Sequence, residues 1–329
     1  MEKRKLGRTG LDVSVLSFGC GAVGGLMTKG EPADQERAFQ RARDLGITYF
    51  DTASSYGNGT SEENLGRILK KLKPNVLIAT KVRLTESEYA RIGPAIVASL
   101  EASLKRLGRE QVDLFQLHNR IAAMTGGDAL EAETVLAEVV PAMEKLRTEG
   151  KIRFFGITAL GETPALAKVV ASGKFQTAQI CFNALVPTAA QAVPAGYPGQ
   201  DYGRLMVAAN AAGMGTIGIR VLAGGALSGS EARHPLNIQN VEPIGSGVVF
   251  AVDVRHARRF EPMIKEGFVG SLPELAIRFA ISEPSLSTTL VGLANLEQLE
   301  AAAAAVQKGP LSAAGRTRLT ALQATLAGT

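Results

Sequence analysis

The sequence predicts an α/β protein, a (β/α)8 TIM barrel formed by one domain over residues 1–329. Three observations predict this fold. Eight short apolar or β-branched runs alternate with longer stretches of helical periodicity, which is the pattern of right-handed parallel βαβ units. Eight such units favour a closed barrel, whose sheet has no edge strand. The length of 329 residues, with 46% hydrophobic and 20% charged residues, suits one barrel of ordinary globular composition.

The strands are predicted in order along the chain. Residues 3–15 are expected to form an N-terminal β-hairpin, because KRKL and LDVSV flank a turn that contains Gly7 and Gly10. The barrel strands are then expected at residues 15–18, 48–51, 76–81, 112–118, 152–157, 178–182, 216–220 and 287–291.

The segments between the strands have helical spacing. Apolar residues recur every three or four positions over residues 92–107 and 132–149, and Gly108 and Gly150 stand just past these helices, where C-terminal glycines are common. Thr60 and Glu63 predict a capping box at the start of the next helix upstream. Shorter helices are expected at residues 34–45, 163–172, 203–212, 272–282 and 295–306.

Two long segments interrupt this rhythm, at about residues 183–202 and 221–271. Both follow strands. In a barrel the segments that follow strands lie on the face that carries the active site, so we expect these two to be long substrate-binding loops at the carboxyl ends of the strands.

Composition argues against several classes of protein. Cys20 and Cys181 form no CxxC pair, so we expect buried free thiols in a reducing, cytoplasmic compartment. The N-terminus has no apolar signal-peptide core, and no apolar run approaches the ~20 residues of a bilayer span, so no membrane partner is expected. The net charge is +5, but the densest basic run, Arg255 to Arg259, lacks interleaved aromatic residues. We expect a solvated helix face there and no nucleic-acid binding.

Polar residues stand at the carboxyl ends of three predicted strands: Asp51, Lys81 and His118, with Tyr56 shortly after Asp51. Taken singly, each has a purely structural explanation. Asp51 would be a helix cap or turn residue and Lys81 a surface lysine. His118 would be a core histidine, which is the commoner case, and Tyr56 a wall residue. Together they favour a site, because a buried lysine and a buried histidine both need partners. The mouth of the barrel would bring these four side chains together.

This group has a chemical use. A tyrosine titrates near pKa ~10, and a nearby ammonium is expected to lower that pKa, so that the hydroxyl becomes a proton donor or acceptor. Asp51 would keep Lys81 charged and in place, and His118 would orient and polarise a carbonyl. Reduction of that carbonyl also needs hydride, which no side chain supplies, so a nicotinamide cofactor is expected.

Six segments resemble the aldo-keto reductase family and occur in the family's order. The most specific is FDTASSYGNGTSEENLGRIL at residues 50–69. The others are KRKLGRTGLDVSVLSFG near the start, IATKV around Lys81, DLFQLH ending at His118, GKIRFFGIT at 150–158 and VGLANLEQLE at 291–300. The resemblance implies a barrel whose hairpin covers its bottom, and an NAD(P)(H)-dependent oxidoreductase that interconverts an aldehyde, ketone or sugar carbonyl and its alcohol, without a metal. Tyr56 would be the general acid/base.

The resemblance also implies binding residues. The cofactor would lie across the barrel mouth without a Rossmann GxGxxG motif. For the substrate it implies Tyr56, His118, Phe182 and Asn183, with Leu185, Val186, Tyr197 and Tyr202 as further candidates for an apolar wall. The implied cofactor contacts are Gly19, Gly21, Asp51, Asn119, Thr158, Gln179, Arg220, Leu222, Gly292, Asn295, Glu297 and Gln298. The run from Gly19 to Gly25 has the glycine content of a phosphate loop, although tight turns after the first strand are the favoured interpretation.

The sequence departs from the family at three places. Thr158 and Ala159 stand where many members have Ser-Asn, and Ile219 and Arg220 stand where an aromatic residue usually stacks on the nicotinamide. Arg220 would then reach the cofactor diphosphate or an acidic group of the substrate. The loop at 292–298 has no cation to pair with a 2′-phosphate, so NADP(H), the family preference, and NAD(H), the preference of this loop, both stay open.

Two other functions are compatible with a barrel of this kind. One is a cofactor-sensing regulatory subunit with the same barrel and little turnover. The other is a metal-dependent hydrolase barrel, which needs clustered ligands at strand ends, whereas the chain has three histidines, His118, His234 and His256. The expected partner is a small carbonyl or alcohol substrate; the substrate itself, the favoured direction and the oligomeric state are not determined by the sequence.

Overall fold

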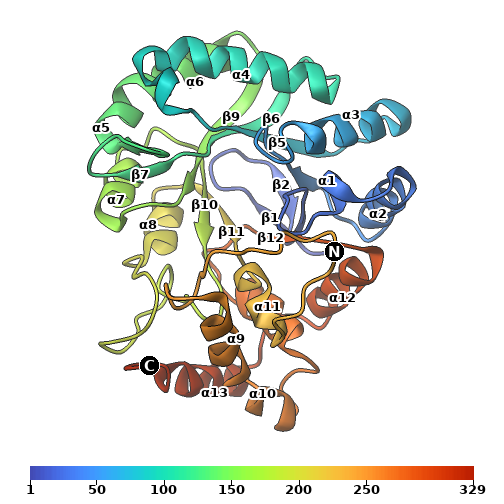
Figure 1. The fold of residues 1–329 in the computed structure, drawn as a ribbon, viewed down its shortest axis with the longest axis vertical. Coiled ribbons are helices and arrows are strands. Elements are labelled where there is room, and N and C mark those ends of the chain that lie inside the picture. The colour runs from blue at the N-terminus through green and yellow to red at the C-terminus, as the bar shows by residue number, and fades with distance from the viewer.

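A closed barrel of eight parallel strands, ringed by helices, forms the centre of the computed structural model, which describes residues 1–329 (Figure 1). Strand β12 pairs in parallel with β3, from Leu16–Thr289 to Gly19–Gly292, and so closes the sheet. The predicted fold and all eight predicted strands are confirmed, with ends that shift by at most two residues. Around the barrel the strands are β3 (Leu16–Gly19), β4 (Tyr49–Asp51), β5 (Leu77–Val82), β6 (Val112–Leu117), β9 (Ile152–Ala159), β10 (Thr177–Cys181), β11 (Gly215–Ile219) and β12 (Thr288–Gly292).

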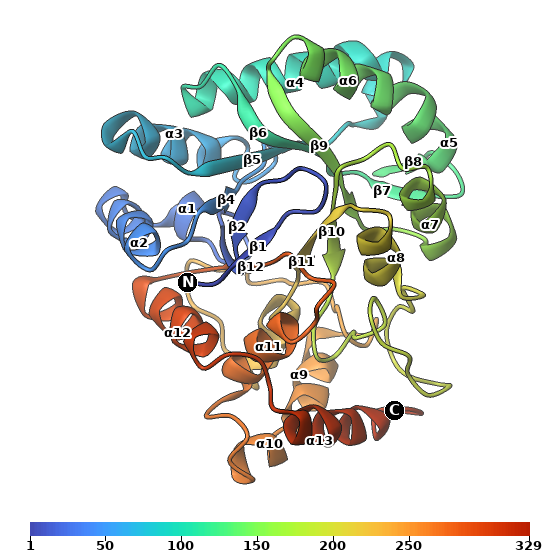
Figure 2. The ribbon, with the colours of Figure 1, turned by 180° about the vertical axis from the view of Figure 1, so that it is seen from behind.

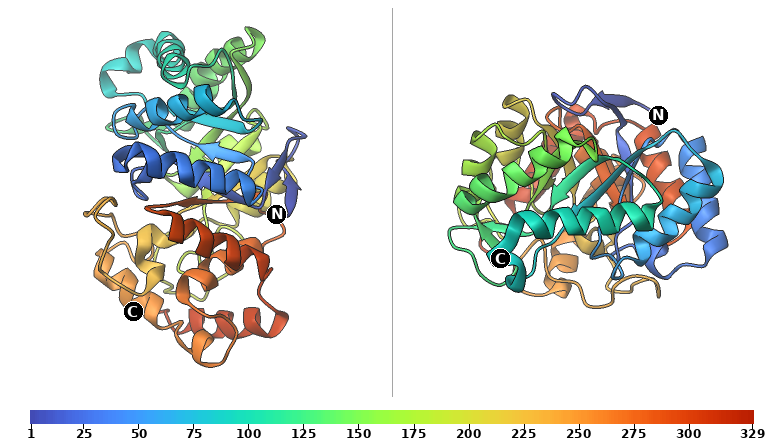
Figure 3. Two further views of the ribbon diagram at one scale, coloured as in Figure 1. Left: turned by 90° about the vertical axis from the view of Figure 1, so that its right-hand side faces the viewer. Right: turned by 90° about the horizontal axis from the view of Figure 1, so that it is seen from above.

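The predicted hairpin covers one end of the barrel. Strands β1 (Lys3–Lys5) and β2 (Asp12–Ser14) pair in antiparallel fashion, and Leu6 and Val13 pack with Tyr49, Leu114 and Ile217 in one buried cluster. Figure 3 shows the hairpin on one side of the barrel and the segment after β11 on the opposite side. The hairpin therefore blocks one end of the barrel and leaves the carboxyl ends of the strands for the site.

The surrounding helices follow the predicted order. Helix α4 (Ile92–Leu107) has the predicted bounds, and Gly108 ends it with a positive φ of 62°. The predicted helix at 132–149 is instead divided into α5 (Ala132–Thr134), a π-helical turn (Val135–Val139) and α6 (Val140–Thr148). Pro141 explains the division, because it has no N–H for a regular helical bond and crowds the preceding turn. The other predicted helices are α2 (Pro32–Asp44), α3 (Thr60–Leu72), α7 (Thr163–Ala171), α8 (Leu205–Ala211), α11 (Leu272–Ile281) and α12 (Leu296–Gln307).

The capping box predicted at Thr60 is wrong. Helix α3 has Gly59 as its N-cap, in a left-handed conformation, and Thr60 is the first helical residue. The Thr60 hydroxyl donates to the Gly57 carbonyl at 2.7 Å instead of capping an N–H of the helix. A turn rich in glycine therefore starts the helix one residue earlier than the prediction required.

The long segment at 221–271 contains more regular structure than the one helix face that the sequence predicted at residues 255–259. It contains a 3-10 turn (Ala223–Ser228), α9 (Phe250–Arg258) and the short α10 (Pro262–Lys265). Helix α9 buries Val254 and Ala257 and leaves the basic side chains of Arg255, Arg258 and Arg259 exposed, as predicted. Helix α13 (Ala313–Ala324) lies beside α10, outside the ring of helices (Figures 1 and 2).

Four short elements complete the structure: α1 (Leu26–Lys29), a 3-10 turn (Glu86–Arg91), β7 (Arg120–Ala122) and β8 (Ala129–Glu131). Strands β7 and β8 pair with each other directly after β6 and place Arg120 beyond the carboxyl end of that strand. None of the helices combines the length and the apolar character that crossing a bilayer requires.

Candidate active site

A fully buried lysine forms the centre of the site. The ammonium of Lys81, on β5, donates to the carboxylate of Asp51, to the carbonyl of Thr52 at 2.8 Å and to the Tyr56 hydroxyl oxygen at 3.2 Å. Burial disfavours the ammonium, but Asp51 and Tyr56 together outweigh this effect, so the pKa of Lys81 is raised. Lys81 is therefore charged where it meets Tyr56.

Asp51, at the end of β4, is surrounded by donors. Its Oδ2 accepts from Gln179 Nε2 at 2.7 Å, from the Tyr49 hydroxyl at 3.2 Å and from Gln116 Nε2 at 3.4 Å. Burial raises the pKa of Asp51 and the Lys81 ammonium opposes that effect. Tyr49 and Gln116 were not predicted, although alternation along a strand was a usable signal: Tyr49 stands two residues before Asp51, and Gln116 two before His118.

Tyr56 is half-buried, and its ring lies 4.7 Å from the Lys81 ammonium. Burial raises the pKa of Tyr56 more than Lys81 lowers it. The expected net lowering of this pKa is therefore wrong, because desolvation of a phenolate is the larger effect here. The hydroxyl is protonated at neutral pH. Since its oxygen accepts from Lys81 and its proton has no protein acceptor, that proton is available to a ligand.

His118 follows β6 and lies edge-on to Tyr56, with 5.7 Å between ring centroids. Its Nδ1 is 3.5 Å from the Ser55 hydroxyl, and Nε2 has no protein partner. Burial, followed by the positive charges of Lys81, Arg83 and Arg220, lowers the pKa of His118 to about 3. His118 is thus a neutral imidazole, and it stands beside Tyr56 as a second hydrogen-bonding group for one carbonyl oxygen.

The polar residues implied for the nicotinamide lie on neighbouring strands. Thr158 on β9 and Gln179 on β10 are paired in register, and the Thr158 hydroxyl donates to Gln179 Oε1 at 3.3 Å. Gly21 leaves room beside Tyr56, since a Cβ there would lie 3.5 Å from the tyrosine ring. A Cβ at Gly19 would lie 2.9 Å from the Val291 carbonyl oxygen, so this glycine serves the close approach of β3 to β12.

The residues implied for the adenosine end are engaged in a helix cap. Asn295 is the N-cap of α12 and its Oδ1 accepts from Gln298 N at 2.9 Å, while Gln298 Oε1 accepts from Ala294 N at 2.8 Å. The exposed Glu297 accepts from Asn295 Nδ2 at 3.3 Å. Gly292, at the end of β12, is exposed beside this cap.

Three implied binding residues have internal roles instead. Asn119 is fully buried and its amide pairs with the backbone N–H and carbonyl of Leu84, each at 2.8 Å. Asn183 is equally buried and accepts from two N–H groups of its own loop. Phe182 stacks on Phe279 of α11, with ring centroids 4.9 Å apart. The predicted wall at Phe182 is wrong, because side chains alternate along β10 and this one points outward to the helices.

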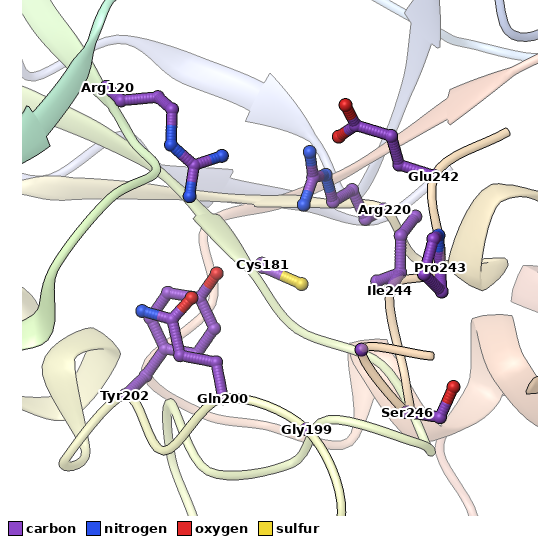
Figure 4. A pocket seen from close by; sticks show the side chains of 11 residues that line it. Arg120, Cys181, Gly199, Gln200, Tyr202, Arg220, Glu242, Pro243, Ile244 and Ser246 are labelled. Atoms are coloured by element: carbon purple, nitrogen blue, oxygen red, sulfur yellow. The ribbon is translucent and has the colours of Figure 1, made fainter. Parts of the chain in front are cut away.

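A cavity of about 510 Å³ lies at the ends of β10 and β11 (Figure 4). Arg220 directly follows β11 and is half-exposed, as is Leu222. Arg120 follows His118 by two residues. Tyr202 was a candidate from the sequence; most of the other lining residues were not predicted, because they come from segments far apart in the chain. The lining is formed by Arg120, Cys181, Gly199, Gln200, Tyr202, Arg220, Glu242, Pro243, Ile244, Ser246 and Gly247.

A buried carboxylate holds one wall of this cavity. Asp253 on α9 accepts from the backbone N–H groups of Ile244, Gly245 and Ser246 at 2.7, 2.8 and 2.7 Å. Three charge-assisted bonds to successive N–H groups give this part of the long segment a defined conformation.

Comparison with known families identifies the family of this chain. The model of the aldo/keto reductase family matches residues 15–324. The chain belongs to the aldo/keto reductase family. The members of this family are oxidoreductases that generally depend on NAD(P)H, as the resemblance implied, and the metal-dependent hydrolase alternative is set aside.

Individual relatives agree with this assignment. The chain is 33% identical to L-galactose dehydrogenase of Arabidopsis thaliana over 163 residues, 49% of each protein, so it spans about half the length of this relative. It is 25% identical to L-glyceraldehyde 3-phosphate reductase of Escherichia coli over 321 residues, 91% of this aldo-keto reductase and 86% of the relative. The holo form of an aldo-keto reductase from Bacillus halodurans has the same fold, with a TM-score of 0.71 and 23% identity over 98% of this chain and 96% of that one.

Proposed function

We propose that this aldo-keto reductase interconverts a small aldehyde, ketone or sugar carbonyl and its alcohol with NADP(H) or NAD(H), and that Tyr56 is the general acid/base. One observation carries the proposal. The ammonium of Lys81 is fully buried, is paired with Asp51 and donates to the Tyr56 oxygen at 3.2 Å. Burying a lysine is costly, and this one is directed at a tyrosine whose own proton has no acceptor in the protein.

The residues fit a nicotinamide cofactor. Such a cofactor, when bound, supplies the hydride that no side chain can provide. Thr158 and Gln179 offer donors and acceptors for a carboxamide, and Gly21 keeps a side chain away from the Tyr56 ring. Glu297 is exposed and no lysine or arginine stands in residues 292–298, which supports NAD(H), whereas the family preference supports NADP(H).

The protein's part in reduction is proton transfer. Tyr56 gives its proton to the carbonyl oxygen while the carbonyl carbon receives hydride, so the substrate gains two electrons and two hydrogens and becomes the alcohol. The Lys81 ammonium stabilises the phenolate left behind, and Asp51 keeps that ammonium in place. Neutral His118 donates a hydrogen bond to the same oxygen. Oxidation of the alcohol runs these transfers in reverse, with Tyr56 as base.

The test is Tyr56→Phe, with Tyr89→Phe as a matched control. The first variant removes the reacting hydroxyl. The second removes a hydroxyl that is bonded to the Gly127 carbonyl and to Asn119, and to none of the four catalytic candidates. Cofactor binding is measured by titration with NADPH and NADH, and turnover with a panel of small carbonyls. We expect Tyr56→Phe to retain binding and to lose about 10²–10⁴-fold in kcat, and the control to retain both.

Other outcomes contradict the proposal in different ways. If neither cofactor binds the wild type, the assignment of the site is wrong. If both cofactors bind but no carbonyl is turned over, the chain is a cofactor-sensing regulatory subunit. The ratio of the two dissociation constants decides between NADP(H) and NAD(H).

A further inference from the structure

Two arginines without a protein partner face the cavity beside the site (Figure 4). Arg120 comes from β7 and Arg220 from the end of β11, one hundred positions later in the chain. Neither guanidinium makes a hydrogen bond or an ion pair with any residue, whereas the neighbouring Arg83 is bonded to Asp128 at 2.7 Å. Like charges repel when they share a cavity, so this arrangement suits a site for an anion.

We propose that this cavity binds an anionic group of the substrate, a carboxylate or a phosphate, between Arg120 and Arg220. The proposal rests on the function proposed above and narrows its substrate class. The substrate would be a small carbonyl compound that carries an acidic group, with its carbonyl at Tyr56 and His118 and its acidic group in the cavity.

The position of the cavity supports this class. Arg120 is separated from His118 by a single residue, and Arg220 is near enough to contribute to the lowered pKa of His118. The volume of about 510 Å³ lies within the range of about 300–1,000 Å³ typical of small-molecule sites. The cavity therefore has room for the acidic part of a small substrate, close in the chain to His118.

Glu242 is the one acidic residue in the lining. It is exposed, and its carboxylate lies on the Arg220 side of the cavity without forming an ion pair (Figure 4). With two arginines and one glutamate, the lining has a net charge of +1. Glu242 therefore weakens the attraction for an anion without cancelling it, which makes this residue useful in a test.

The cofactor diphosphate is a second source of the same chemistry. It is a weaker candidate, because it would have to reach Arg120, which lies beyond the carboxyl end of β6, as well as Arg220. A substrate bound at Tyr56 and His118 is already close to Arg120, because Arg120 follows His118 by two residues. Cofactor binding and acid preference, measured on the same variant, separate the substrate's acidic group from the cofactor diphosphate.

The experiment measures preference for an acid. Succinic semialdehyde and butyraldehyde have the same carbon number and differ in a carboxylate, so the ratio of their kcat/KM values reports binding of that group. We expect the wild type to prefer succinic semialdehyde, and Arg120→Gln to reduce the ratio about tenfold or more, mainly through KM. Arg83→Gln, which removes an equal charge outside the cavity, is expected to keep the ratio, and Glu242→Gln to increase it. Glyceraldehyde 3-phosphate and glyceraldehyde form the second pair, for phosphate.

The outcomes are distinct. A wild type without preference for either acid, or an Arg120→Gln variant with an unchanged ratio, overturns the proposal. If the variant weakens binding of NADPH and NADH and leaves the ratio unchanged, the anion is the cofactor diphosphate, which also overturns it. Thermal midpoints show that the variants are folded, which is expected because Arg120 is exposed and unpaired. Failure of the underlying function is seen separately, as turnover that survives Tyr56→Phe.

Discussion

Replacing Lys81 by methionine tests how much the buried ion pair with Asp51 affects stability. The two side chains are 0% and 1% exposed, so Lys81→Met keeps most of the volume and leaves an uncompensated carboxylate inside the barrel. Breaking a buried pair in this way costs about 3–5 kcal/mol. A chain of 329 residues unfolds with an entropy of about 0.7 kcal/mol/K, so the thermal midpoint should fall by about 4–7 °C.

The double variant Asp51→Asn/Lys81→Met makes this prediction sharper. Asp51→Asn alone leaves the Lys81 ammonium buried with one neutral backbone acceptor, the Thr52 carbonyl, and the Tyr56 oxygen. The double variant removes both charges of the buried pair, and the amide introduced at position 51 can still accept from Gln179 and Tyr49. We therefore expect it to unfold at a higher temperature than either single variant.

The pH dependence of stability separates the effect of the unpaired Asp51 charge from the effect of the changed side-chain shape at position 81. In Lys81→Met the ammonium no longer opposes the burial that raises the pKa of Asp51, and only the hydrogen bonds from Tyr49 and Gln179 still lower it, so its folded value stays above the unfolded value of about 3.9. The loss of stability relative to the wild type is then larger at neutral pH and shrinks as pH falls through the folded pKa of Asp51 towards the unfolded value of about 3.9, below which the carboxyl group is protonated in both states.

Far-UV circular dichroism is the suitable assay, because the chain has no tryptophan. Midpoints of the wild type, both single variants and the double variant would be compared at several pH values. An equal loss in Lys81→Met at pH 7 and pH 4, or a double variant no more stable than the single ones, would refute the reasoning.

Two further predictions concern the loop and the pH profile. Asp253→Asn should weaken the three bonds to residues 244–246, each worth about 1.5–3 kcal/mol, and raise KM more than it lowers kcat; an unchanged KM in steady-state kinetics contradicts this role. His118, with its pKa lowered to about 3, is neutral from pH 5 to 8, so kcat/KM for reduction should be flat there and fall only in alkali, where Tyr56, whose pKa is raised, loses its proton. A step in that profile near pH 6.5 would count against the assignment.

Local patterns in the sequence were sufficient for the barrel. Strand runs and helical spacing depend on neighbours a few residues away, and for this reason α4 has the predicted bounds and all eight strands were found. The predictions failed where a local pattern met a second constraint. Pro141 divides the helix predicted at 132–149, and the turn before Thr60 replaces its capping box. Only the solvated face of α9 was predicted, because its short apolar face lies in a segment without a strong period.

The sequence by itself determined which residues could react: Asp51, Lys81 and His118 stand at strand ends, and closure of any such barrel brings strand ends together. Only the tertiary structure decided what each of them faces. It placed Tyr49 and Gln116 around Asp51, turned Phe182 outward and brought Arg120 and Arg220 to one cavity. The physical reason is the distance along the chain over which the deciding interactions act. Periodicity tells which side of a strand a residue occupies, whereas its partner across the barrel depends on the register of all eight strands and on the loops that cover them.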